Sequence, residues 1–270
     1  MKKLFFCLVL IFILFGFFTL SSFSQDFNFS KAYADYTFQL SQYQKAHSEY
    51  ELAKAAYAQS DTLAARSEAQ TKTASMLGAR DETVRTYLVA IRLRLGEVGG
   101  ILSTEKDPLF SGLDSEAAWY ESHRKEVSSA GSLEDLVRQS GEAKARFENE
   151  TTNIAYKSLL TISKGKITVR RNDAGGIISA LDAKIAEIRQ NGDKETVEIE
   201  RWMLDAHAKL DRSDEKIGEA GGEIAGLDDA KKDKLKIYNE SIFSLDESFQ
   251  FIKEAVTFMK QVVREVKTAD

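Results

Sequence analysis

The chain contains one proline and one cysteine in 270 residues, and both shortages narrow the choice of fold. Turn-rich folds such as β-sandwiches use proline and glycine often, so a single proline argues against them. The lone Cys7 lies near the start, so no disulfide can form within the chain, and helix packing must supply the stability. A composition rich in Ala, Glu, Lys, Leu and Arg then predicts long helices with few connections.

Metal-binding patterns are also missing. The histidines outside the first 24 residues are His47, His123 and His207, and none has glutamate three positions before it, as helical di-iron sites require. There is no His-Glu-x-x-His segment, and the cysteine at position 7 has no companion ligand. We therefore expect no metal and no cofactor.

Catalytic motifs are equally scarce. No Gly-x-Ser-x-Gly elbow occurs between a strand and a helix, because no convincing strand is present. The paired glycines at 99–100, 175–176 and 221–222 lack the Gly-Lys-Ser/Thr continuation of a phosphate-binding loop. Acidic pairs such as Glu134 and Asp135 fit solvated helix faces. The sequence predicts no catalytic residues and a non-enzymatic protein.

The N-terminus has the three parts of a secretory signal peptide. Lys2 and Lys3 precede an apolar run from Leu4 to Leu20, and Ser22-Phe23-Ser24 offers a small-x-small cleavage site. Residues 1–24 are therefore expected to be a signal peptide, which places the protein in the periplasm or outside a bacterial cell. The alternative is an uncleaved inner-membrane anchor formed by residues 4–20, close to the shortest run of roughly 17 residues that spans a bilayer.

Removal of residues 1–24 takes away two lysines and no acids, so the net charge becomes 35 − 42 = −7. Nucleic-acid binding needs a positive surface, and no nucleic-acid partner is expected. One basic cluster stands out as a candidate basic patch: Lys164, Lys166, Arg170 and Arg171. It fits an exposed helix surface, and the alternative is contact with an anionic envelope polymer or lipid.

Apolar residues recur at alternating steps of three and four, which is the spacing of coiled-coil seams. The pattern predicts an all-α fold, an elongated bundle of about five to six long antiparallel, coiled-coil-like helices. We expect an N-terminal helical hairpin over residues 25–103, a connecting loop over 104–114 around Pro108, and a helical bundle region with long C-terminal helices over 115–270.

The predicted hairpin pairs residues 30–59 with 62–102, with Ser30 as the first N-cap and a turn at 60–62. Its first seam is dominated by tyrosine, and these residues form a candidate interaction surface: Tyr33, Tyr36, Tyr43, Tyr50 and Tyr57. Two roles are open to this tyrosine surface: packing within the hairpin, or stacking on glycans or peptides. In the second seam, from Leu77 to Leu102, only Asp81 is out of character.

The C-terminal region contains the clearest start and stop signals. Ser132 begins a helix with capping-box character, and Asn191-Gly192-Asp193 ends one helix and starts the next. The seam over 199–227 alternates large residues with alanine or serine, and its glycines at 218, 222 and 226 suggest close helix contact, a helix break or a hinge. The seam over 235–266 is the broadest, so this helix is predicted at the centre of the bundle.

These features favour an exported, non-enzymatic scaffold or protein-interaction protein of the cell envelope or extracellular space. Its expected partners are other proteins or further copies of itself, with membrane contact only through an uncleaved anchor or peripheral binding. Two alternatives are a membrane-active, pore-forming-like helical protein and a periplasmic chaperone or ligand-binding bundle.

Overall fold

The structure is a computed structural model that describes residues 28–192, 196–229 and 233–267. Over these ranges the chain is helical throughout apart from short connections, with no strand, which confirms the predicted all-α bundle. The expected signal peptide, the anchor alternative and the expected cap at Asp193 lie outside the described residues. The elements are α2 (Phe29–Gln59), α3 (Leu63–Glu97), α4 (Ser103–Ser128), α5 (Leu133–Arg146), the π-helical η1 (Phe147–Thr151), α6 (Thr152–Asn191), α7 (Val197–Gly226) and α8 (Lys234–Lys267).

Polar side chains cap the N-termini of α2, α3 and α5. The side chain of Thr62 accepts a hydrogen bond from the first turn of α3, and Ser132 does the same for α5, as predicted. Gly192 ends α6 in the left-handed conformation that glycine adopts without strain. At the start of α2 the prediction was wrong by two residues, because Asn28 is the N-cap and Ser30 already lies in the helix.

The expected loop at 104–114 is helical, because α4 begins at Ser103 and runs through Pro108. Proline removes one backbone hydrogen bond, from its own missing N–H to the carbonyl of Thr104. Both residues are exposed near the helix start, so water can satisfy that carbonyl. The connection between the two helices is instead the short stretch 98–102.

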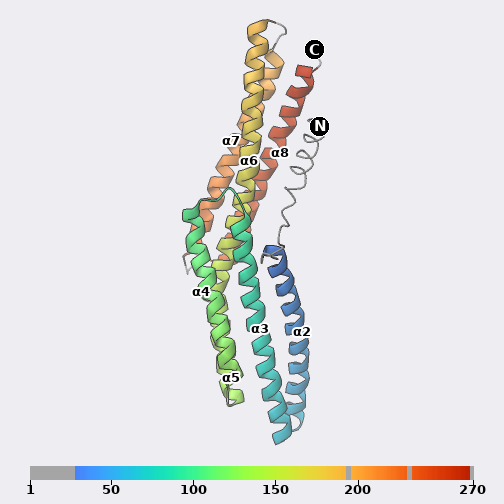
Figure 1. The fold of residues 1–270 in the computed structure, drawn as a ribbon, viewed down its shortest axis with the longest axis vertical. Coiled ribbons are helices and arrows are strands. Elements are labelled where there is room, and N and C mark those ends of the chain that lie inside the picture. The colour runs from blue at the N-terminus through green and yellow to red at the C-terminus, as the bar shows by residue number, and fades with distance from the viewer. Residues whose placement is uncertain (1–27, 193–195, 230–232, 268–270) are drawn as a thin grey trace, which may run out of the picture.

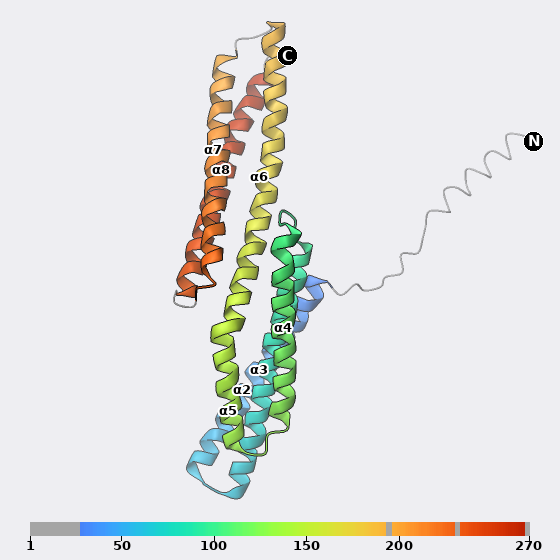
Figure 2. The same ribbon diagram turned by 90° about the vertical axis from the view of Figure 1, so that its left-hand side faces the viewer.

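The helices form two bundles that share α6 (Figure 1). In the lower bundle α2 packs on α3, and α3 also contacts α4, α5 and the first part of α6. In the upper bundle α6 packs against α7 and α8, from Tyr156 and Leu160 onward. Figure 2 shows α6 passing from one bundle into the other without interruption.

Helices α5, η1 and α6 form one continuous run from Leu133 to Asn191. The extra residue of a π-helical turn rotates the helix face that follows it. Before η1 the run buries Leu136 and Ala143, and after it the run buries Ala155 and Ile162 against α3 and α4. The glycine pair at 175–176 lies inside α6 and does not break it.

The α3–α4 connection crosses α6 in direct backbone contact at Gly165. A Cβ atom on Gly165 would lie 2.5 Å from the Ile101 side chain and 2.7 Å from the Gly99 carbonyl oxygen. Gly100 has φ +72°, and a Cβ atom there would lie 2.5 Å from the Gly165 carbonyl oxygen. Glycine is therefore required on both sides of this crossing.

Helices α7 and α8 approach closely along a seam of small residues. Each helix has a small buried residue every seven positions, and the pairs are Ala206 with Ala255, Ser213 with Ser248, and Ala220 with Ser241. The two numbers in each pair add to 461, which is the register of an antiparallel hairpin. The Ser213 and Ser248 hydroxyls lie 2.8 Å apart, which confirms that register.

The predicted central position of α8 is wrong in part. Leu245 and Ile252 are buried, and α8 does cover both α6 and α7. Its outer face is open, however, because Phe243 and Phe249 are exposed, and the shared helix is α6. The glycines of α7 are not a contact site either, since a Cβ atom at Gly218 or Gly222 would meet nothing within 4 Å.

Candidate functional site

Asp81, which interrupts the second apolar seam, belongs to a buried polar cluster between α3, α4 and α5. Asp81 and His123 are 0% and 2% exposed, and the Asp81 Oδ2 atom lies 2.6 Å from His123 Nδ1. The other ring nitrogen lies 3.1 Å from the Gln139 carbonyl oxygen, and Arg80 donates to Asp81 Oδ1. Both ring nitrogens of His123 therefore face acceptor oxygens.

The Trp119 ring contacts both the Asp81–His123 pair and a second pair, Glu116 with Arg146. It stacks on His123 with centroids 4.7 Å apart, and the Arg146 guanidinium lies 5.5 Å from its centre. Arg146 forms an ion pair with the buried Glu116. The hydrogen bond between the two side chains raises the pKa of Arg146. The Thr151 hydroxyl donates to Glu116 at 2.8 Å.

This cluster has the residue types of a catalytic site but not the access. The carboxylates of Asp81 and Glu116 and the His123 ring are closed to solvent, so in this structure no substrate reaches them. The cluster ties α3 and α4 to α5 and η1. Removing one partner of such a pair leaves an uncompensated buried group, which costs about 3–5 kcal/mol of unfolding free energy.

The candidate tyrosine surface mostly faces α3. Tyr43 and Tyr50 pack against the core around Leu77, and the rings of Tyr36 and Tyr87 lie 5.2 Å apart. Only Tyr33 is exposed by more than half. These contacts support packing within the hairpin over an open binding surface.

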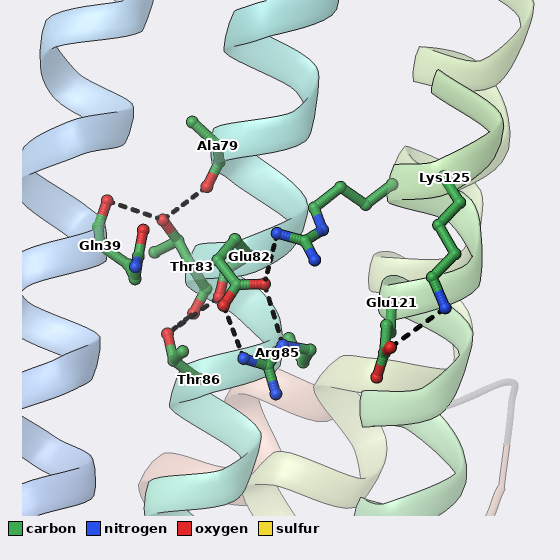
Figure 3. A network of polar contacts seen from close by, with 9 residues as sticks. Gln39, Ala79, Glu82, Thr83, Arg85, Thr86, Glu121 and Lys125 are labelled. Carbon is green, nitrogen blue, oxygen red and sulfur yellow. Dashed lines mark hydrogen bonds and ion pairs between the residues drawn. The ribbon is translucent and has the colours of Figure 1, made fainter. Parts of the chain in front are cut away.

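Polar bonds also hold α2 to α3 (Figure 3). The Thr83 hydroxyl lies 3.1 Å from the Gln39 carbonyl oxygen of α2 and 2.8 Å from the Ala79 carbonyl oxygen of its own helix. On the next face of α3, Glu82 accepts hydrogen bonds from Arg85, and this bond raises the pKa of Arg85. The Thr83–Gln39 contact adds to the tyrosine contacts that fix α2 on α3, whereas the Glu82–Arg85 bonds lie within α3.

The candidate basic patch does not act as one surface. Lys164 donates to Glu105 at 3.0 Å, and Arg171 makes two bonds to Asp214, at 2.7 and 2.6 Å. Both are therefore committed to helix packing. Lys166 and Arg170 point elsewhere, and both line a groove between α6 and α8.

This α6–α8 groove consists of two adjoining hollows of about 650 and 550 Å³ that share Arg170 and Phe249. The lower hollow begins at the end of α3, and the upper one follows α6 and α8 toward the end of the molecule marked C in Figure 1. The apolar side chains lining it are Val98, Ile167, Val169, Ile177, Phe249 and Val256. Phe249 is 41% exposed, an unusual position for a phenylalanine of a helix seam.

The rim of the groove is basic, and its cations are Arg94, Lys166, Arg170, Lys253 and Lys260. Within the described ranges Lys166, Lys253 and Lys260 form no ion pair with a carboxylate, although Lys253 lies over the Phe249 ring at 5.1 Å. The other two cations have acidic neighbours. The Arg170 guanidinium lies 4.0 Å from the Asp173 carboxylate, and Arg94 forms an ion pair with Glu97. The groove is thus apolar in its floor and has cations free for another molecule.

Sequence reasoning found Lys166 and Arg170 and missed Phe249, Lys253 and Lys260. The last three are four and seven positions apart, so one helix face carries them. Phe249 belongs to the broad α8 stripe, which was interpreted as core, and Lys253 and Lys260 were not singled out.

Among the described residues no three potential metal ligands gather within reach of one ion. In the same part of the chain, no helix has an apolar stretch that could span a bilayer. The sequence matches no protein-family model, no curated protein and no solved structure. The α6–α8 groove is the candidate site that the described residues offer.

Proposed function

We propose that this protein is an exported, non-enzymatic helical interaction protein that binds a protein partner through the α6–α8 groove. The observation that carries the proposal is the exposed apolar floor of the groove, around Phe249, beside cations that no carboxylate of the described chain neutralises. Exposed apolar residues gathered in one concave place mark binding sites on soluble proteins. The long shared helix α6 supplies a rigid support for such a site.

Site-specific photo-cross-linking in envelope extracts of the source organism tests the docking site. A photoreactive phenylalanine analogue replaces Phe249 in one protein and the similarly exposed Phe38 of α2 in the control. We expect a discrete cross-linked protein from position 249 and none from position 38. Equal cross-linking from both positions, or none from position 249, would contradict the proposal.

Two readouts, the cross-linking pattern and a separate liposome leakage assay, test the two alternative functions. A ladder of many unrelated cross-linked proteins would indicate a chaperone that holds clients. Release of dye from liposomes at micromolar protein would indicate a membrane-active protein.

Cell fractionation followed by N-terminal sequencing tests export. The expected product lies outside the cytoplasm and begins at Gln25. A cytoplasmic product that still begins at Met1 would contradict that part of the proposal.

A further inference from the structure

We infer that the α6–α8 groove binds one amphipathic helix of a protein partner, about four turns long, with acidic residues flanking its apolar face. This inference rests on the proposed function and adds the chemistry of the partner. Three features of the groove support it: where the cover of α6 stops, how α6 and α8 are aligned, and which charges are left unpaired.

The cover of α6 stops at the glycine crossing. Up to Gly165 one side of the helix is covered by α3 and α4, whose connection crosses it there, while Leu160 on another side already packs on the α7–α8 end. Beyond that point α3 and α4 no longer cover it. Its contacts with α7 and α8 continue through residues such as Ile178, and Val169 and Ile177 are exposed. The upper bundle thus has three helices, and the groove occupies the place of a fourth.

Helices α6 and α8 run parallel along the groove, because α7 returns the chain between them (Figures 1 and 2). The lining residues extend from Ser163 to Ile177 on α6 and from Asp246 to Lys260 on α8, which is 177 − 163 = 14 and 260 − 246 = 14 positions. At a rise of 1.5 Å per residue, the groove is roughly 21 Å long and matches a helix of about 14 residues.

The unpaired charges on the rim of the groove favour a partner helix that carries acidic residues. Glu97 and Asp173 already have partners in Arg94 and Arg170, which leaves Asp246 as the single carboxylate of the rim without an ion pair in the described chain. Against it stand three lysines: Lys166, Lys253 and Lys260. Glutamates on both flanks of an apolar helix face would complement this rim.

A membrane surface fits the same charges less well. A bilayer is flat or gently curved on this scale, and it cannot enter a hollow to reach Val98 and Ile167 at the base of the groove. A helix can, because its side chains interdigitate with those of two parallel neighbours.

Two synthetic helical peptides test the inference by fluorescence anisotropy. Both are 18 residues long with leucine at spacings of three and four, and they carry either glutamate or lysine on the flanks. We expect the glutamate peptide to bind at least about tenfold more tightly than the lysine peptide, with weaker binding at high salt. Equal affinity for the two peptides, or no binding of the glutamate peptide, would overturn the inference.

Charge reversal locates the binding site. The double variant Lys166→Glu/Lys253→Glu should weaken binding of the glutamate peptide by at least about tenfold. The matched control is Lys45→Glu/Arg201→Glu, which makes the same charge change at exposed positions outside the groove and should leave binding unchanged. Circular dichroism verifies that both variants fold. Equal affinities of the two variants would overturn the inference.

Two further measurements cover other occupants. Co-sedimentation with vesicles of phosphatidylcholine and phosphatidylglycerol (3:1) that is lost in the groove variant would make the occupant a lipid surface. Concentration-dependent dimerisation in the ultracentrifuge, lost in the same variant, would make it a second copy. Either result would overturn the inference.

The cross-linked peptide from position 249 separates this inference from the proposed function. An acidic amphipathic segment supports both. A basic or extended segment of one discrete partner overturns the inference and leaves the proposed function in place.

Discussion

Replacing His123 with leucine tests the buried polar cluster. The substitution leaves the Asp81 carboxylate fully buried, with Arg80 as its remaining partner, and removes the bond to the Gln139 carbonyl oxygen. Breaking a buried ion pair on one side costs about 3–5 kcal/mol of unfolding free energy. Because Arg80 still pairs with Asp81 Oδ1, we expect a value near the lower end, about 3 kcal/mol.

The double variant Asp81→Leu/His123→Leu should recover part of that loss, since it removes the buried Asp81 carboxylate that His123→Leu leaves without its bond to the imidazole. Apolar residues in place of a buried pair are often neutral, so the double variant should be more stable than the sum of the two single changes by at least about 1.5 kcal/mol. Urea unfolding followed by circular dichroism at 222 nm measures all four proteins of this cycle.

The chain provides a matched control. His207 lies 2.9 Å from Asp182, but both side chains are nearly half exposed. His207→Leu should therefore change the unfolding free energy by less than about 1 kcal/mol. A His123→Leu loss equal to that of His207→Leu, or strict additivity in the cycle, would refute the burial argument.

Three more outcomes follow from the packing. Gly165→Val should lower the unfolding free energy by about 1–3 kcal/mol, because its Cβ atom would lie 2.5 Å from Ile101, and a thermal melt identical to that of the parent would contradict the glycine crossing. Leu245→Ala should cost about 2–5 kcal/mol in urea unfolding, and a loss below 1 kcal/mol would mean that the α7–α8 seam can collapse around the gap. Burial raises the pKa of Tyr120 above its ordinary value of 10.0, so the folded state holds that proton more tightly than the unfolded state. This group therefore contributes stability that is complete below pH 10 and is lost as the pH rises above it. We expect Tyr120→Phe to flatten the fall in unfolding free energy between pH 9 and 11. An unchanged slope would mean that the hydroxyl is not buried.

The sequence predicted where the helices lie along the chain better than it predicted which helices pack together. Heptad spacing and caps such as Ser132 and Gly192 act locally, so they identified most of the helices and several of their ends. The start of α4 was missed because Pro108 is read as a helix breaker, whereas an exposed proline near a helix start leaves only one carbonyl to water. The π-helical η1 has no simple sequence signal and also was not predicted.

The candidate site could be predicted only in part, because its parts meet through long-range packing. Whether a lysine is free depends on acids far along the chain: Glu105 neutralises Lys164, and Asp214 neutralises Arg171. Lys166 became a candidate with them but differs in having no such partner. The contribution of Phe249 depends on which face of α8 lies beside α6, and the seam pattern alone does not give that face.

The unbroken helical run from Leu133 to Asn191 sets a fixed length along the molecule. It contains 191 − 133 + 1 = 59 residues, or roughly 88 Å at 1.5 Å per residue. Since no linker separates the two bundles, a molecule held at Phe249 and another held at the α2–α3 turn would be kept at a set spacing. Changing that spacing would require bending a continuous helix, which side chains brace along most of its length.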